Sequence, residues 1–194
     1  GFAVEFVSGV KIDEMTIGNS HGGIVAVCSE RTVPSVHDMR VKENGFYVML
    51  EGIEDPYNFG YCLRSLYAAG VDGILVGPRN WFSAAGVVCR ASAGASELFE
   101  IAAGDTVETV RIFKEKGYTV LAADKTDDAV SIYDKEVKTP VLLVVGGEKR
   151  GISSSVLSKA DQIVRIDYGR EFSSALSAAS ASTILAFEVL RRNK

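Results

Sequence analysis

An asparagine and an arginine, Asn58 and Arg64, stand six residues apart in the segment DPYNFGYCLRSLYAAG, residues 55–70. Apolar runs flank this segment, so it lies where a strand passes into a helix and the helix returns to a strand. A guanidinium can bind a phosphate through two parallel hydrogen bonds and polarise a nearby hydroxyl, and an amide can orient either group. The pair is therefore expected to have a role beyond packing; the alternative is that Arg64 forms a surface salt bridge. Asp55 and Pro56 predict the turn that begins the helix.

A second candidate site is the segment VVGGEKRGIS, residues 144–153, which also follows a strand-like apolar run. Gly146 and Gly147 allow the backbone to turn sharply and to approach a ligand closely. Glu148 falls in this turn, and Gly151 leads into the next helix. Because ligands of open parallel sheets bind outside the carboxyl ends of the strands, this segment is a candidate binding loop. The alternative is an ordinary strand-to-helix turn in which Glu148 is a solvated charge.

A third segment, residues 164–192, has the pattern of a strand, a polar loop with a glycine, and a helix rich in alanine and serine. Ser173, Ser174 and Ser177 can present hydroxyls at the loop and at the first turn of that helix, which is expected over residues 174–192. The small residues favour a buried helix that another backbone approaches closely. Helix capping and helix packing are the alternative roles of these serines.

Strands that alternate with helices must position these three segments. The strand patterns cover residues 46–50, 73–76, 98–101, 119–122, 141–145 and 163–166. The clearest helix begins at Asp105, with Glu108 three residues later as in a capping box, and ends at Gly117. This alternation predicts an α/β fold with a mainly parallel sheet flanked by helices.

The first 44 residues follow a different pattern. Two strand-like pieces, residues 3–7 and 24–28, flank a helical turn and the loop GNSHGG. Two strands and a loop cannot form a core by themselves. We therefore interpret residues 1–33 as the remnant of a small N-terminal domain, residues 34–44 as a linker, and residues 45–194 as the main domain.

The composition excludes several classes of protein. A chain of 194 residues fits one domain, or one domain and a fragment, and its net charge of −4 argues against general coating of nucleic acid while leaving room for a local basic patch. The three cysteines are widely spaced and the histidines number two, so we expect neither disulfides nor a metal site, and a reducing cytoplasmic location. No apolar run is long enough to span a membrane, and Gly1 does not begin a signal peptide.

Familiar catalytic motifs are also missing. The sequence has no G-x-G-x-x-G after a strand and no G-x-x-x-x-G-K-[ST], the two glycine motifs that bind nucleotides, and it has no G-x-S-x-G turn. His21 and His37 both precede the main domain, which excludes a Ser-His-Asp triad within it. A generic α/β enzyme acting on a small molecule is therefore a weak hypothesis.

The order of the three segments resembles the SpoU (TrmH-like) branch of the SPOUT RNA methyltransferases, over about residues 45–192. The family's D-P-x-N-x-G…R motif is matched at Asp55, Pro56, Asn58, Gly60 and Arg64, and its G-x-E-x-x-G loop at Gly146, Glu148 and Gly151. HGGIVA, residues 21–26, is similar to the end of the ribosomal-protein-like substrate-binding domain that often precedes this catalytic domain.

The resemblance implies an α/β fold with a C-terminal trefoil knot, an exception to unknotted topology. It also implies a homodimer, S-adenosylmethionine as the cofactor, and transfer of a methyl group to a ribose 2′-hydroxyl of rRNA or tRNA. The implied catalytic residues are Asn58, Arg64, Glu148 and Ser177. The implied cofactor-binding residues are Gly146, Gly147, Gly151, Ile166 and Leu176.

The third motif departs from the family pattern. The usual Ile-Pro-Met is Ile166-Asp167-Tyr168, and Ser-Leu-Asn corresponds to residues 175–177 if aligned from the helix or 174–176 if aligned from the strand. Neither alignment retains the asparagine. The alternative function is therefore a non-catalytic knotted module that binds the cofactor or RNA.

Basic residues near the second and third segments are candidates for RNA binding. They are Arg79, Lys149, Arg150, Arg165 and Arg170, with Trp81, Phe82 and Phe172 as candidates for stacking on a base. They would gather at one end of the sheet and form a local basic patch on an otherwise acidic protein.

Overall fold

The computed structural model describes residues 1, 3–16, 21–29, 31–78 and 84–194, which divide into two units, Gly1–Thr32 and Val33–Lys194. Within the first unit, α1 (Gly9–Met15) is capped by Ser8, whose side chain accepts a hydrogen bond from the Lys11 amide. Residues 3–7 and 24–28 were expected to be strand-like, and this prediction is wrong for the structure: both are irregular. Neither has a ladder partner among the described residues, and an extended segment without one does not form a strand.

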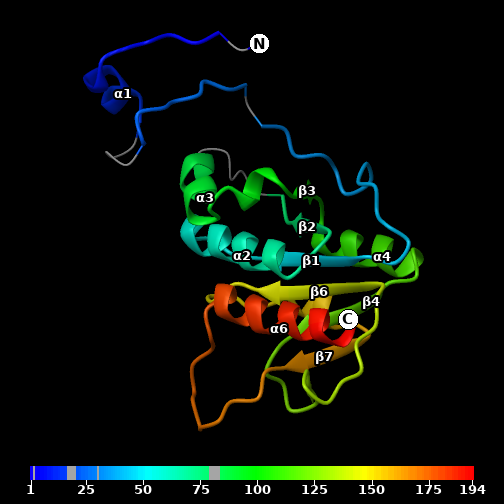
Figure 1. The fold of residues 1–194 in the computed structure, drawn as a ribbon. Helices are drawn as coiled ribbons and strands as arrows, with labels where there is room; N and C mark the ends of the chain where they lie inside the picture. The colour runs from blue at the N-terminus through cyan, green and yellow to red at the C-terminus, as the bar shows by residue number, and fades with distance from the viewer. Residues whose placement is uncertain (2, 17–20, 30, 79–83) are drawn as a thin grey trace. The chain divides into compact units, whose positions relative to one another are not determined.

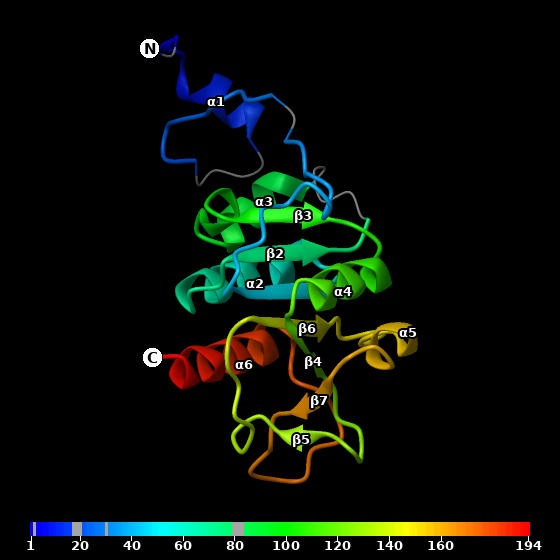
Figure 2. The ribbon, with the colours of Figure 1, turned by 90° about the vertical axis from the view of Figure 1, so that its right-hand side faces the viewer.

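The second unit is built on one parallel sheet of seven strands among the described residues (Figures 1 and 2). The strands are β1 (Phe46–Glu51), β2 (Gly73–Val76), β3 (Glu100–Ala103), β4 (Thr119–Ala123), β5 (Val130–Ser131), β6 (Val141–Gly146) and β7 (Gln162–Arg165). Their order is β3-β2-β1-β6-β4-β7-β5, and every pair is parallel. The predicted α/β fold with a mainly parallel sheet is confirmed, while the trefoil knot stays a prediction.

Two strands differ from the sequence prediction. The strand expected over residues 98–101 begins at Glu100, because residues Ala95–Glu97 form a 3-10 turn and Leu98 ends that turn with its side chain exposed. The short strand β5 was not predicted. It pairs with β7 through Val130 and Ser131, and two residues are too few to show a periodic pattern.

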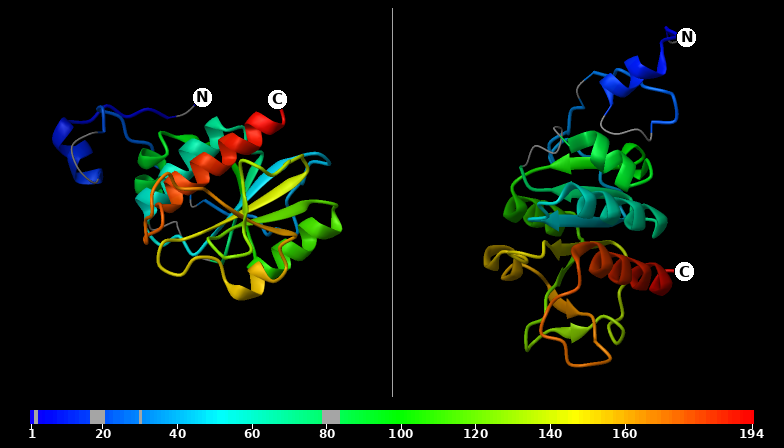
Figure 3. Two further views of the ribbon diagram at one scale, coloured as in Figure 1. Left: turned by 90° about the horizontal axis from the view of Figure 1, so that it is seen from below. Right: turned by 90° about the vertical axis from the view of Figure 1, so that its left-hand side faces the viewer.

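Helices cover both faces of the sheet, as Figure 3 shows in the view from below. One face packs against α2 (Pro56–Ala68), α3 (Ala85–Ala91) and α6 (Ala178–Arg192), and the other against α4 (Thr106–Glu115) and the short α5 (Ser154–Leu157). Alternate residues of β1 show this division: Val48 belongs to the first core layer, and Tyr47 and Met49 to the second. All three are buried, as expected for a strand covered on both faces.

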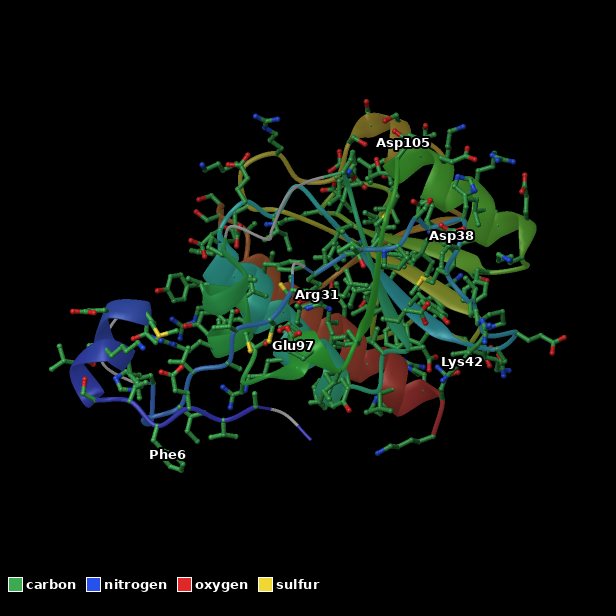
Figure 4. All side chains as sticks on the ribbon, turned by 90° about the horizontal axis from the view of Figure 1, so that it is seen from above. Phe6, Arg31, Asp38, Lys42, Glu97 and Asp105 are labelled. Atoms are coloured by element: carbon green, nitrogen blue, oxygen red, sulfur yellow. The ribbon has the colours of Figure 1, made fainter. Side chains whose placement is uncertain are left out.

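The N-terminus of α4 forms as predicted. Asp105, labelled in Figure 4, is the cap residue, and its Oδ1 accepts a hydrogen bond from the Glu108 amide at 2.9 Å. The helix ends before Gly117, whose φ of 82° lies in the left-handed region that glycine adopts without strain.

The segment before β1, residues 34–44, packs on the α4 side of the sheet. Val36 and Met39 are buried in that core layer, and Ser35 forms an isolated bridge with Ala103 of β3. Lys42, labelled in Figure 4, forms an ion pair with Asp72 at 2.5 Å. This segment therefore contributes side chains to the core of the second unit.

The last helix is shorter than predicted. It begins at Ala178, because Ser177 stays extended and caps it: the Ser177 hydroxyl accepts a hydrogen bond from the Ser180 amide at 3.1 Å. The expectation of helix from residue 174 is therefore wrong. Residues 166–177 instead form an irregular loop that links β7 to α6.

Candidate active site

The first motif begins α2 as expected. The Asp55 side chain accepts a hydrogen bond from the Asn58 amide at 2.8 Å, and Pro56 occupies the first helical position. Gly60 has a packing role, because a Cβ at this position would lie 2.5 Å from the Ala91 Cβ of α3. Arg64 is exposed one and a half turns after Asn58, and its guanidinium has no hydrogen-bond or ion-pair partner among the described residues.

Glu148 joins the three motifs. Its Oε1 accepts one hydrogen bond from the Asn58 side-chain amide and another from the backbone amide of Ala178, each at 3.0 Å. The first contact ties the loop after β6 to α2, and the second ties it to the N-terminus of α6. A carboxylate at this end of a helix also interacts favourably with the helix dipole. Segments 90 and 30 residues apart in the chain therefore meet at one oxygen atom.

The glycines of the second loop are required by close packing of backbone on backbone. A Cβ at Gly146 would lie 2.4 Å from the Gly151 carbonyl carbon, and one at Gly147 would lie 2.2 Å from the Gly52 oxygen. Gly151 has a φ of 63°, in the region that disfavours other residues. Sequence reasoning assigned Gly146 and Gly147 to close approach by a ligand, whereas in the structure their missing side chains accommodate the protein's own chain.

Glu51, at the end of β1, holds the same loop at both ends and was not singled out from the sequence. Its backbone oxygen accepts from the Gly147 amide at 2.8 Å, and its carboxylate accepts from the Ser153 amide at 3.1 Å and the Ser153 hydroxyl at 2.8 Å. A third bond, at 3.2 Å, comes from the Thr106 hydroxyl. An acidic residue that ends an apolar strand beside the first motif was the available signal.

A pocket of about 190 Å³ opens beside Glu148, at the carboxyl ends of β4, β6 and β7. All five residues predicted to bind the cofactor line it: Gly146, Gly147, Gly151, Ile166 and Leu176. Ala123, Val145 and Val164 supply apolar surface, while Asp124, Lys125, Arg165 and Tyr168 supply polar groups. Asn58, Arg64 and Ser177 are not part of the lining, although Asn58 is hydrogen-bonded to Glu148, which is.

The loop over residues 166–177 forms one wall of this pocket and is held by two side chains, Tyr168 and Lys125. The Leu176 amide donates a hydrogen bond to the Tyr168 hydroxyl at 3.2 Å. The Lys125 ammonium donates to the Phe172 carbonyl at 3.0 Å and lies 5.0 Å from the centre of the Tyr168 ring. Tyr168, one of the residues that depart from the family motif, therefore stabilises the wall.

Asp167, the other departing residue, fixes the turn after β7. Hydrogen bonds from Ser131 and from Arg165 hold the pKa of the Asp167 carboxyl below its usual range. The Arg165 Nε donates to Asp167 at 2.9 Å, and an Arg165 terminal nitrogen donates to the Ala129 carbonyl. The guanidinium predicted to bind RNA is thus bonded within the protein.

The other basic candidates differ in their surroundings. Arg79 lies outside the described residues, as do Trp81 and Phe82. Lys149 is exposed and forms an ion pair with Glu54 at 3.1 Å, while Arg150 and Arg170 are exposed. Lys149, Arg150 and Arg170 follow β6 or β7, at the predicted edge of the sheet, but their contact with RNA stays a prediction.

Behind Glu148, α2 and α6 pack side by side (Figure 1). Burial raises the pKa of the Cys62 thiol on α2 to about 12, against the lowering effect of a hydrogen bond with Ser182 on α6. This thiol therefore stays protonated and is a packing group.

Among the described residues, no group of three or more acidic, cysteine or histidine side chains is placed to hold a metal ion. Likewise, no helix in the described part of the chain is long and apolar enough to cross a membrane.

Comparison with known proteins identifies the family. A model of the SpoU rRNA Methylase family matches residues 45–187. Over its whole length the chain is 29% identical to the 23S rRNA (guanosine-2'-O-)-methyltransferase RlmB of Shewanella oneidensis, of which it covers 80%. It also resembles the AdoMet-bound rRNA methyltransferase from Sinorhizobium meliloti, with a TM-score of 0.74 and 27% identity over 83% of this chain and 61% of that chain.

A solved RNA 2'-O ribose methyltransferase is similar to the same degree, with a TM-score of 0.73 and 27% identity over 84% of this chain and 61% of that chain. The chain thus spans less than two thirds of the length of these two solved proteins. The family match, in contrast, covers more than half of this chain and includes all three motifs. The chain belongs to the SpoU rRNA methylase family.

Proposed function

We propose that this protein is an RNA methyltransferase that uses S-adenosylmethionine to methylate a ribose 2′-hydroxyl of ribosomal or transfer RNA. The observation that carries this proposal is the junction at Glu148, where one carboxylate oxygen binds Asn58 and the first amide of α6 beside the pocket. The family match and the AdoMet-bound relative support the same activity.

The residues present fit the cofactor. The pocket combines the apolar surface of Val145, Val164 and Ile166, suited to a base, with carboxylates and backbone groups that can bind hydroxyls and an amino group. The volume of the pocket, about 190 Å³, is below the roughly 300 Å³ of a typical small-molecule site, so the pocket would hold only one portion of the cofactor. When bound, the cofactor supplies a methyl group already activated by a sulfonium, so no metal is needed.

The chain's own residues then act on the acceptor. Arg64 is exposed and without a partner among the described residues, so its guanidinium is available to bind the phosphate beside the target ribose and to polarise the 2′-hydroxyl. A guanidinium keeps its charge in proteins, so it is a poor base but a permanent cation. Asn58 and Glu148 position the surrounding surface, because each is hydrogen-bonded to the other. Ser177 caps α6, and it stands in place of the family's asparagine if the third motif is aligned from the helix.

We also propose that two copies of the chain associate through the surface of α2 and α6. Tyr57, Tyr61 and Tyr67 on α2 and Phe187 on α6 are each more than two fifths exposed, although large aromatic side chains are usually covered. Analytical ultracentrifugation tests this: we expect a dimer for the unaltered protein and a shift toward monomer for Tyr61→Glu. A monomer at micromolar concentration would contradict the proposal.

The activity is tested with labelled S-adenosylmethionine and total RNA, followed by digestion and identification of 2′-O-methylated nucleotides. We expect transfer by the unaltered protein and its loss, by 100-fold or more, in Arg64→Ala, while calorimetry shows nearly unchanged cofactor affinity. Arg111→Ala is the matched control, since Arg111 is an exposed arginine on α4 across the sheet. Cofactor binding without transfer to any RNA would instead favour the non-catalytic module.

A further inference from the structure

Asp124 is an acidic residue in the pocket that the sequence did not single out. It follows the last residue of β4, lines the pocket and is half-buried. Its backbone amide donates to the Val164 carbonyl of β7 at 3.0 Å, and its Oδ1 accepts from the Lys125 amide at 2.6 Å. These two bonds fix the residue, while its Oδ2 has no hydrogen-bond partner among the described residues.

The pocket contains two carboxylates, and they are engaged differently. Glu148 uses Oε1 to join Asn58 and the start of α6, so its position is set by the motif junction. In the described part of the chain, no hydrogen bond or ion pair joins the Asp124 side chain to a motif side chain. The predicted cofactor-binding residues are glycines and aliphatic side chains, which supply backbone groups and apolar surface but no charged acceptor. Asp124 is therefore a carboxylate acceptor that a ligand with paired donors can reach.

The order of the strands indicates which part of the ligand Asp124 faces. The second loop follows β6, which has β1 on one side and β4 on the other. Asn58 lies on the β1 side of that loop, and Asp124 on the β4 side, next to the apolar ends of β4 and β7. A flat base would fit this apolar side, which would leave the sugar attached to it near Asp124 and the reactive end on the side of Asn58.

Two adjacent hydroxyls donate well to one carboxylate, which accepts through two oxygens, and other parallel α/β folds use an acidic residue after a strand in this way. We propose that Asp124 binds the ribose cis-diol of the cofactor and makes the pocket selective for a ribonucleoside. This inference rests on the proposed function, because it assigns a role toward S-adenosylmethionine.

Calorimetry with two ligands tests the inference without requiring turnover. The ligands are S-adenosylhomocysteine and its 2′-deoxy analogue, titrated into the whole chain and into Asp124→Ala. A site built to bind a hydroxyl discriminates strongly against a ligand that lacks it. We expect the unaltered protein to bind the ribose form at least about 10-fold more tightly. In Asp124→Ala the two ligands should bind within about 3-fold of each other.

Two further variants control for general damage to the loop. Asp124→Asn can keep the acceptor for the Lys125 amide, so it preserves the local turn while removing the charge, and its discrimination should fall as well. Asp128→Asn changes an exposed aspartate of the same loop that does not line the pocket, and it should behave as the unaltered protein. Thermal unfolding confirms that each variant is folded.

The outcomes separate this inference from the proposed function. If the unaltered protein binds both ligands equally, or if Asp124→Ala still prefers the ribose form to the same degree, Asp124 does not bind the diol. The proposed cofactor site is not contradicted by either result. A uniform weakening of both ligands in Asp124→Ala also overturns the inference. If the unaltered protein binds neither ligand, both the cofactor site and the role of Asp124 are wrong.

Discussion

Replacing Glu148 tests whether the junction of the three motifs supports activity. In Glu148→Ala the side-chain amide of Asn58 and the Ala178 amide both lose their acceptor, at contacts that are 3.0 Å long. Hydrogen bonds to a charged group contribute about 1.5–3 kcal/mol when protected from water, and Glu148 is exposed, so we assign about 1 kcal/mol to each. A total of about 2 kcal/mol corresponds to a roughly 30-fold loss in kcat/KM if the junction exists to position the site.

Glu148→Gln separates the acceptor from the charge. A glutamine carbonyl oxygen can accept both bonds, as Oε1 does, so only the charge assistance is lost. We expect a loss of about 1 kcal/mol, or about 5-fold in kcat/KM. The assay is transfer of a labelled methyl group to RNA at varied cofactor and RNA concentrations, with thermal unfolding as the control for stability.

Two results would refute this reasoning about Glu148. If the glutamine variant is as inactive as the alanine variant, the carboxylate charge acts directly on the reaction. If the alanine variant is fully active, the contacts to Asn58 and Ala178 do not position the site.

Two other predictions concern stability. Gly147→Ala should lower the free energy of unfolding by about 1–3 kcal/mol, because the added Cβ would lie 2.2 Å from the Gly52 oxygen. Gly169→Ala is the control and should change the free energy of unfolding little, because a Cβ there would have no atom within 4 Å; equal urea midpoints for the two variants would contradict this prediction. Glu188 is held by two arginines, which lower the pKa of its carboxyl to about 2, so it stabilises the fold above about pH 4.5 and this contribution is lost as the pH falls toward 2. The difference in unfolding free energy between the unaltered protein and Glu188→Gln should therefore disappear near pH 2, and a constant difference across this range would show that charge is not its source.

The sequence was sufficient for the main features of the sheet and for the association of the motifs. The strands β1, β2 and β6 are apolar runs in which every residue is buried except the last one of β1 and of β6, so each run is visible without its neighbours. The turn at Asp55 and the cap at Asp105 are local, because each side chain bonds an amide three residues later. Local rules of this kind can be applied to one segment at a time.

What could not be predicted depends on contacts between distant segments. The two-residue strand β5 exists only through its pairing with β7. Glu51 contacts Ser153, and the position of Asp124 in the pocket depends on strand order, which a single sequence does not reveal. The helix over residues 178–192 was expected to begin four residues earlier, because serine and alanine do not mark a boundary until the Ser177 cap and the bond to Glu148 are known.

The wall formed by residues 166–177 has a consequence for synthesis. The chain is synthesised from its N-terminus, so Asn58, Arg64 and Glu148 emerge from the ribosome before this wall. They also emerge before α6, which packs on α2. A nascent chain ending at residue 165 would carry Asn58, Arg64 and the second loop, but it would lack Ile166 and Leu176 of the pocket. The pocket is thus complete only after α6 has been translated as far as Leu185, which is later than the last strand of the sheet.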